Sequence, residues 1–250
     1  MRRQKKKMPM MNREIRKQTK LSSATPFSVR EAYKITRTNI MFSLTEEGCR
    51  RIAVSSSYPE EGKTTTCTNL ALSFAQMGKK VLIIDCDLRK PQVHNVFGLD
   101  NQAGISNVLG GLAKVEDVLH YIEENHVSVI TSGHIPPNPA ELLASERMKM
   151  LLEELEKAYD YIFIDTPPVN VVTDAVTLSS VISGTLLVAK QGESTHKDIE
   201  AALNKLSLGK VKVLGFVLTG EKQKGGSYGK YGKYGKYGKY GSYKEYAAYE

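Results

Sequence analysis

The sequence predicts an α/β fold built on a doubly wound, mostly parallel sheet. Two observations lead to this expectation. Short apolar runs rich in Val, Ile and Leu alternate with segments of helical periodicity along the middle of the chain, which is typical of parallel strands covered by helices on both faces. In addition, the first of these runs is followed directly by a Gly-Lys-Thr-Thr turn that opens a helix. A turn of this kind at a strand-to-helix junction is typical of a phosphate-binding loop.

The elements follow one another in a regular order. A first amphipathic helix is expected from Ser28, because Ala32, Ile35, Ile40 and Phe42 recur among charged residues at roughly helical spacing. The expected strands are residues 52–55, 81–85, 127–130, 161–165, 185–189 and 211–218. The expected helices that alternate with them are residues 63–77, 115–122, 145–158, 174–182 and 195–208.

The net charge of the 250-residue chain is +8, but the excess positive charge lies at its two ends. Residues 1–20 hold nine Lys and Arg against one Glu, and residues 221–250 hold seven Lys against three Glu. The part between them holds 19 basic and 23 acidic residues. The basic balance therefore does not indicate a nucleic-acid-binding body. We expect a basic flexible arm (1–27), which either binds anionic lipid or is simply solvated, one α/β domain (28–220) and a tail (221–250).

Cysteine usage and hydropathy indicate a cytosolic chain. The three cysteines, Cys49, Cys67 and Cys86, are odd in number and form no CxxC pair, which argues against a disulfide framework or a zinc site. No apolar run reaches the roughly 18 to 20 residues of a membrane span, and the basic N-terminus lacks the apolar core of a secretory signal.

The turn after the first strand has the composition of a phosphate loop. It comprises Ser57, Tyr58, Pro59, Glu60, Glu61, Gly62, Lys63, Thr64 and Thr65. Lys63 is expected to reach the β- and γ-phosphate oxygens and the Thr64 hydroxyl to bind Mg²⁺, which indicates a P-loop NTPase type of sheet. The loop departs from the usual pattern at Glu60, where Gly is common because the turn and the close phosphate disfavour a Cβ.

Acidic residues follow two further strands. Asp85 and Asp87 come at the end of one apolar strand, and Asp165 ends another. Ligands in open α/β sheets bind outside the carboxyl ends of the strands, so these three carboxylates are expected near Lys63. Residues two apart on a strand face the same way, which lets Asp85 and Asp87 share one site if the strand persists to residue 87.

These motifs resemble the bacterial protein-tyrosine kinase family of capsular and exopolysaccharide synthesis, in its separate cytosolic Gram-positive form. The resemblance covers roughly residues 26–250 and is carried by PEEGKTTT, IIDCDLRKP, YIFIDTPP, PPNPAELLAS and the tyrosine-rich end. It implies a protein-tyrosine kinase that uses ATP and Mg²⁺ and regulates polysaccharide synthesis and export. Lys63 then binds the nucleotide, and Thr64, Asp87 and Asp165 lie at the metal. One of Asp85 and Asp87 accepts the tyrosine proton.

The last thirty residues carry eight tyrosines at an unbroken spacing of three, mostly separated by Gly-Lys. Because Gly and Lys give this segment no aliphatic core, we expect a disordered tail. In the family that the sequence resembles, such tyrosines are phosphorylated in trans by a neighbouring subunit. The implied acceptors are Tyr228, Tyr231, Tyr234, Tyr237, Tyr240, Tyr243, Tyr246 and Tyr249.

The resemblance also implies partners. The family assembles into rings through an E-x-x-R-x-x-R helix motif, which is matched here by Glu31, Lys34 and Arg37. Lys at the second position loses the bidentate geometry of Arg. The implied partners are neighbouring subunits of a homo-oligomeric ring, a membrane-bound activator of the polysaccharide chain-length type and a cognate tyrosine phosphatase. The kinase is then cytoplasmic and peripheral at the inner face of the membrane, with no specific nucleic acid.

Two other functions fit parts of the sequence. A partition-type ATPase without kinase activity shares the sheet and the acidic strand ends, but it carries a second Lys five residues before the main one, where Tyr58 stands. Interleaved Lys and Tyr in the tail can also bind nucleic acid by charge and stacking. Arg89 and Lys90, just after the acidic pair, either assist phosphate or tail binding or form a structural ion pair. Thr219 stands at a strand end where related ATPases often carry an Asn for the base.

Overall fold

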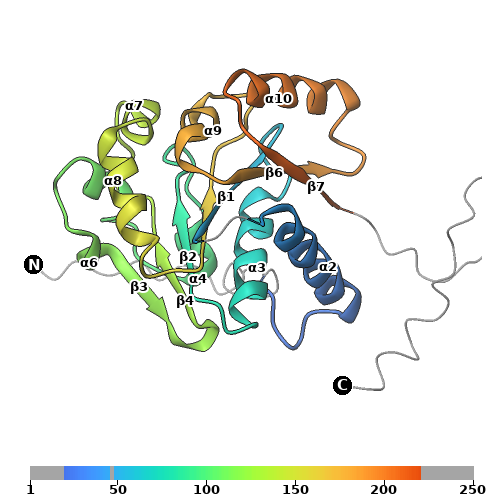
Figure 1. Ribbon diagram of the computed structural model, residues 1–250, viewed down its shortest axis with the longest axis horizontal. Coiled ribbons are helices and arrows are strands. Elements are labelled where there is room, and N and C mark those ends of the chain that lie inside the picture. The colour runs from blue at the N-terminus through green and yellow to red at the C-terminus, as the bar shows by residue number, and fades with distance from the viewer. Residues whose placement is uncertain (1–19, 46–47, 221–250) are drawn as a thin grey trace, which may run out of the picture.

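The computed structural model describes residues 20–45 and 48–220, and a seven-stranded sheet forms the centre of this part of the chain (Figure 1). The strand order is β3-β4-β2-β5-β1-β6-β7. Strand β3 pairs antiparallel with β4, and all the other pairs are parallel. The strands are β1 (Arg50–Ser56), β2 (Val81–Asp85), β3 (Leu119–Ile122), β4 (Val127–Ile130), β5 (Tyr161–Asp165), β6 (Gly184–Lys190) and β7 (Val213–Thr219).

Helices cover both faces of the sheet, so the predicted doubly wound fold is confirmed. One face is covered by α2 (Phe27–Ser43), α3 (Lys63–Ala75) and α4 (Val93–Phe97). The opposite face is covered by α5 (Ile105–Leu109), α6 (Val115–Val118), α7 (Pro139–Leu143), α8 (Glu146–Leu155), α9 (Asp174–Thr177) and α10 (His196–Leu208). Two short 3₁₀ turns complete the described elements, η1 (Glu123–Asn125) and η2 (Ser179–Val181).

The three central strands bring the acidic strand ends to one edge. Strands β2, β5 and β1 lie side by side, and they are apolar on both faces because each face is packed against helices. In this register Asp85 lies opposite Asp165, and Asp165 lies opposite Val54 of β1. The chain that continues β1 as the phosphate loop therefore emerges directly beside both carboxylates.

The structure corrects the expected elements in three places. Residues 119–122, expected to end a helix, form the edge strand β3, because Leu119 and Ile122 pair with β4. The expected helix 174–182 is divided into α9 and η2. Helices α4, α5 and α7 were not expected, since each is only five residues long and too short to show a helical period.

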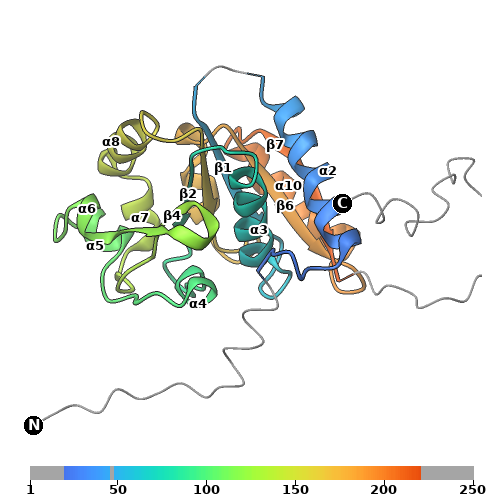
Figure 2. The same cartoon turned by 90° about the horizontal axis from the view of Figure 1, so that it is seen from below.

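The first helix is present, but its apolar face differs from the one expected. Ile40 is buried, whereas Ile35 is 60% exposed and Phe42 is 79% exposed. Tyr33 instead packs against the core, where its hydroxyl accepts a hydrogen bond from Asn69 of α3. Figure 2 shows α2 beside α3 and close to β7. Its packed side is therefore the one that faces these two elements.

The predicted arm and tail lie largely outside the described residues. Of the arm, residues 20–27 are described, and Leu21 is buried with its backbone N–H donating to Asn69 Oδ1 (2.8 Å). All eight tail tyrosines lie beyond Gly220, and their predicted disorder is not tested. Among residues 20–45 and 48–220, no helix combines the length and the apolar character needed to cross a bilayer.

Candidate active site

The phosphate loop joins β1 to α3 and leaves the N-terminus of α3 open to a ligand. Gly62 caps the helix with φ 92°, a backbone conformation that glycine adopts without strain. A Cβ at this position would also lie 3.4 Å from the Thr219 side chain. Because the first backbone N–H groups of a helix have no partner within the helix, this end is suited to binding phosphate oxygens.

Glu60 lies in the left-handed region, with φ 66°. The sequence suggested that a glycine-like turn is needed at this position, and the backbone has that conformation although the residue is Glu. A side chain with a Cβ costs about 1 to 2 kcal/mol in this region. The loop is therefore strained at Glu60 while keeping the path of a phosphate loop.

Replacing this residue by glycine is expected to stabilise the protein. Glu60→Gly should raise the free energy of unfolding by about 1 kcal/mol. Removing the Cβ relieves the strain, but glycine also increases the entropy of the unfolded chain, which offsets part of that stabilisation. Urea unfolding measures the change. Glu60→Ala is the matched control, since it removes the same carboxylate but keeps the Cβ. Equal stability of the two variants would contradict the strain.

Glu61 holds the loop from inside, a role that its sequence position does not reveal. Its carboxylate is buried and accepts hydrogen bonds from the Tyr58 backbone N–H (2.9 Å) and from the Ser194 hydroxyl (2.6 Å). The Thr219 hydroxyl donates to the Glu61 carbonyl (2.7 Å). The strand-end Thr219 therefore braces the phosphate loop in this structure.

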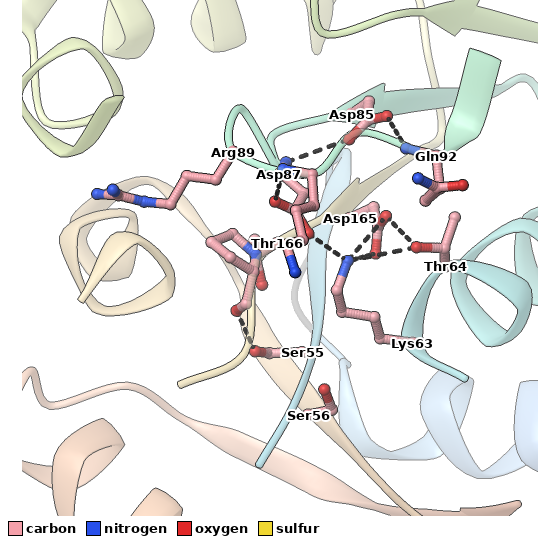
Figure 3. A network of polar contacts seen from close by, with 12 residues as sticks. Ser55, Ser56, Lys63, Thr64, Asp85, Asp87, Arg89, Gln92, Asp165 and Thr166 are labelled. Carbon is pink, nitrogen blue, oxygen red and sulfur yellow. Dashed lines mark hydrogen bonds and ion pairs between the residues drawn. The ribbon is translucent and has the colours of Figure 1, made fainter. Parts of the chain in front are cut away.

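The basic and acidic side chains that were expected to meet lie together at the loop (Figure 3). Lys63 Nζ lies 2.7 Å from Asp87 Oδ2 and 3.4 Å from Asp165 Oδ2. The Thr64 hydroxyl donates to Asp165 Oδ2 at 2.6 Å. These four residues come from α3, from the segment after β2 and from the end of β5.

Burial and charge oppose each other in this cluster. Burial by itself lowers the pKa of Lys63, but the carboxylates of Asp165 and Asp87 more than offset it, and the pKa is raised above that of an ordinary lysine. Burial raises the pKa of Asp165, against the opposing effects of Lys63 and Thr64. Lys63 is therefore held as a cation among the carboxylates.

Asp85 has a different role from Asp87. Strand β2 ends at Asp85, so the alternation that would have aimed both side chains at one site does not continue to Asp87. Asp85 is fully buried and accepts backbone N–H donors from Asp87 (3.1 Å), Gln92 (3.1 Å) and Val93 (2.9 Å). Asp85 thus ties the segment after β2 together, and Asp87 is the carboxylate presented to Lys63.

Arg89 forms a structural ion pair. Its guanidinium donates twice to Asp174 of α9, from Nε at 3.0 Å and from Nη2 at 3.1 Å, and Asp174 is fully buried. In Figure 3 the Arg89 side chain points away from Lys63. Lys90 is exposed, while its backbone N–H donates to Asp87 Oδ1 (2.9 Å) and fixes the second oxygen of that carboxylate.

A cavity of about 530 Å³ opens beside this cluster. Its polar wall comes from the phosphate loop with Lys63 and from Asp87, Arg89, Lys90 and Gln92. Its apolar wall comes from Pro167, Pro168, Val171 and Val172. Of the predicted loop residues, it is lined by Pro59, Glu60, Gly62, Lys63, Thr64 and Thr65. The others lie elsewhere, since the Ser57 hydroxyl is directed to the Asp198 carbonyl (3.4 Å) and Tyr58 is 45% exposed.

A second cavity of about 1160 Å³ adjoins the phosphate loop on its other side. It is bounded by α2, by Glu60, Glu61 and Gly62 of the loop, and by the ends of β6 and β7. Glu60 and Gly62 line both cavities, so the loop separates a space beside the acidic cluster from a larger space beneath α2.

The residues expected to support ring assembly are engaged within the chain. Lys34 forms an ion pair with Glu31 at 2.8 Å. Arg37 lies further along α2, where Nη1 donates to the Ser73 carbonyl (2.6 Å) and hydroxyl (3.1 Å) of α3. The structure therefore brings Glu31 and Lys34 together and turns Arg37 toward the neighbouring helix.

Comparison with known proteins identifies the family. A family model described as an AAA domain matches residues 49–205. The tyrosine-protein kinase YwqD of Bacillus subtilis is 44% identical over 200 residues, which cover 80% of this chain and 84% of that protein. This chain belongs to the bacterial tyrosine kinases. The match to a longer relative, the tyrosine-protein kinase ptk of Acinetobacter johnsonii, covers 79% of this chain but only 27% of that protein. This chain therefore corresponds to one part of that relative.

Solved structures agree with this assignment. The kinase domain of the Escherichia coli tyrosine kinase ETK superposes with a TM-score of 0.76 at 34% identity, covering 82% of this chain and 80% of that one. A cobyrinic acid a,c-diamide synthase from Mycobacterium smegmatis, solved with an ATP analogue and magnesium, shares the fold with a TM-score of 0.60 at 18% identity, covering 68% and 72% of the two chains. The predicted P-loop NTPase fold and tyrosine kinase family are thus confirmed.

Proposed function

We propose that this kinase transfers the γ-phosphoryl group of ATP to the tyrosines of its C-terminal tail, acting in trans on a neighbouring subunit, and thereby regulates capsular or exopolysaccharide synthesis and export. The observation that carries the proposal is the convergence of Lys63, Thr64, Asp87 and Asp165 beside an open helix N-terminus. The adjoining apolar wall suits an aromatic ring.

The chain's own residues divide the work of phosphoryl transfer. The α3 N-terminus and Lys63 bind and neutralise the phosphates, and the raised pKa of Lys63 keeps it charged. Asp87 lies 2.7 Å from Lys63 and lines the cavity, so it accepts the phenolic proton of an entering tyrosine. Asp85, held by three backbone donors, positions the segment that carries Asp87.

The donor set fits Mg²⁺. Thr64 and Asp165 share a 2.6 Å hydrogen bond and, with Asp87, offer only oxygen ligands at the place where the phosphates are expected. Mg²⁺ retains waters and phosphate oxygens, so one hydroxyl and one or two carboxylates suffice to hold it. When bound, the metal neutralises charge on the β- and γ-phosphates. The fold shared with the magnesium-containing synthase supports the same cofactors here.

The tail supplies acceptors of suitable form. In the proposed domain organisation, an arm (1–27) and a kinase domain (28–220) are followed by a separate low-complexity tail (221–250). An extended chain spaces tyrosines three residues apart by about 10 Å, so one phenol enters a cleft without its neighbours. Each phosphate adds about −1.5 to −2 charge, which reverses the positive tail and weakens its attraction to an acidic body.

The proposed setting follows from the family. The kinase is cytoplasmic and is held at the inner face of the membrane by a membrane-bound activator of the polysaccharide chain-length type. It assembles with identical subunits into a ring, in which Glu31, Lys34 and Arg37 of α2 contribute to contacts. A cognate tyrosine phosphatase removes the phosphates.

Mass spectrometry of the phosphorylated chain tests the proposal. After incubation with Mg²⁺-ATP and the activator fragment, we expect phosphotyrosine at positions between Tyr228 and Tyr249. ATP turnover without phosphotyrosine would instead indicate the partition-type ATPase. Tail binding to single-stranded DNA without labelling would indicate the nucleic-acid function.

A mixing experiment tests transfer between subunits. A Lys63→Met chain with an intact tail is combined with an active chain truncated after Gly220. We expect label on the Lys63→Met chain, because its tail enters the site of the active partner. Absence of label there, with normal labelling of the full-length active chain, would exclude transfer in trans.

A further inference from the structure

The apolar wall of the smaller cavity is an irregular segment, residues 166–173, between β5 and α9. Its backbone is hydrogen-bonded to the phosphate loop on one side and to α10 on the other. The N–H groups of Val169 and Asn170 donate to the carbonyls of Ser56 and Ser57, at 2.8 and 3.2 Å. This segment is therefore fastened along one side to the start of the phosphate loop.

Lys205 of α10 fastens the other side. Its ammonium donates to the carbonyls of Asn170 (2.8 Å) and Val169 (3.3 Å), the same two residues whose N–H groups face the phosphate loop. Within residues 20–45 and 48–220, no carboxylate lies within 4 Å of this ammonium. The charge of Lys205 is thus directed at backbone carbonyls, and the segment is held between the loop and α10.

The start of α10 adds a second contact. The Asn170 side-chain amide donates to the Asp198 carbonyl (2.8 Å), so both ends of α10 contact the segment. Val171 and Val172 follow immediately and line the cavity, and Val171 is 55% exposed. The position of these two side chains is set by the backbone that Lys205 holds.

We propose that Lys205 is a positioning residue for the tyrosine acceptor: it holds the carbonyls of Val169 and Asn170 so that the wall formed by Val171 and Val172 aligns an entering phenol with Asp87. This inference rests on the proposed function, because it places the acceptor in this cavity. The phosphate loop is braced separately by Glu61, Ser194 and Thr219. The segment is also hydrogen-bonded to Ser56 and Ser57, so we expect Lys205 to affect nucleotide binding much less than the acceptor, and not through the braced end of the loop.

Acceptor kinetics of the full-length chain test the proposal. Lys205→Met keeps the aliphatic stem and the helix propensity but removes the ammonium. Using a synthetic peptide of residues 225–249 and saturating Mg²⁺-ATP, we expect the acceptor KM to rise about tenfold, with a smaller change in kcat, because the wall loses its fixed position. The Kd of a fluorescent ADP should change less than about twofold, since that loop keeps its own bonds.

Two further variants make the result specific. Lys197→Met removes an exposed lysine from the same helix and should leave the acceptor KM unchanged. Lys205→Arg keeps a positive donor and should restore most of the acceptor affinity. An unchanged acceptor KM in Lys205→Met, the same rise in Lys197→Met, or an equal loss of nucleotide affinity would each overturn the proposal.

Hydrogen exchange separates this inference from the proposed function. In Lys205→Met, the amides of Thr166 and of residues 169–173 should exchange about tenfold faster than in the unsubstituted chain or in Lys197→Met, because the segment opens locally. If the unsubstituted chain labels no tyrosine, the proposed function fails and the acceptor role falls with it, whatever the exchange shows. If tyrosine is labelled and exchange is unchanged, only the role of Lys205 is refuted.

Discussion

Lys63→Met is expected to reduce tyrosine phosphorylation by a factor of about 10³ or more, because it removes the cation that neutralises charge on the transferred phosphoryl group. The structure adds a second consequence. Lys63 is the cation beside the buried carboxylates of Asp87 and Asp165, so its removal leaves them uncompensated. We expect the free energy of unfolding to fall by about 3 kcal/mol. The loss is smaller if the carboxyl groups become protonated, because a neutral carboxyl no longer needs a compensating cation.

Lys63→Arg is the matched control for this experiment. It keeps a positive charge among the carboxylates, so its melting temperature should stay close to that of the unsubstituted chain. Its planar, longer side chain does not reproduce the ammonium position, so labelling should still be lost. The measurements are initial rates of phosphotyrosine formation and thermal unfolding of both variants. Substantial labelling by Lys63→Met would contradict the assigned role.

The second large effect is expected from the acidic pair. Asp87→Asn should lower kcat by about 10² to 10⁴, because an amide cannot accept the phenolic proton, while the fold is retained. Asp87 makes its contacts at the cavity, where Lys63 and the Lys90 backbone N–H meet its two oxygens. Pre-steady-state labelling of the tail peptide measures the chemical step.

Asp85→Asn makes the same chemical change two residues earlier and should act mainly on stability. Three backbone N–H groups donate to the buried Asp85 carboxylate, and an amide presents an NH₂ group to some of these donors. The expected loss is about 1 to 3 kcal/mol, measured by urea unfolding, with a smaller fall in kcat. Burial also raises the pKa of Asp85. If Asp85→Asn instead caused the large fall in kcat and Asp87→Asn mainly lowered stability, Asp85 would be the base.

Much of the fold could be predicted from the sequence, because the central strands are continuous apolar runs. Residues 81–85, 127–130 and 161–165 were expected as strands and form β2, β4 and β5 with those bounds. Such runs are buried on both faces wherever they lie in a parallel sheet, so their own composition is sufficient. The phosphate loop was recognisable for a similar reason, since Gly62 and Lys63 are required by local backbone geometry and charge.

Features that depend on distant residues were missed. Residues 119–122 have apolar residues at helical spacing, and only their pairing with β4 makes them a strand. Two supports of the site were also missed: Glu61 is held by Ser194, and Lys205 holds carbonyls 35 and 36 residues away. No local pattern marks these residues, because their partners lie on other elements.

The sequence by itself determined which chemical groups stand at the ends of which strands: a lysine and two threonines after one, a pair of aspartates after another and a single aspartate after a third. It could not separate Asp85 from Asp87. Both are acidic, both follow the same apolar strand, and a local pattern gives them the same signal. The tertiary structure decided between them, because β2 ends at Asp85 and the backbone then turns, enclosing one carboxylate among N–H donors and presenting the other to Lys63.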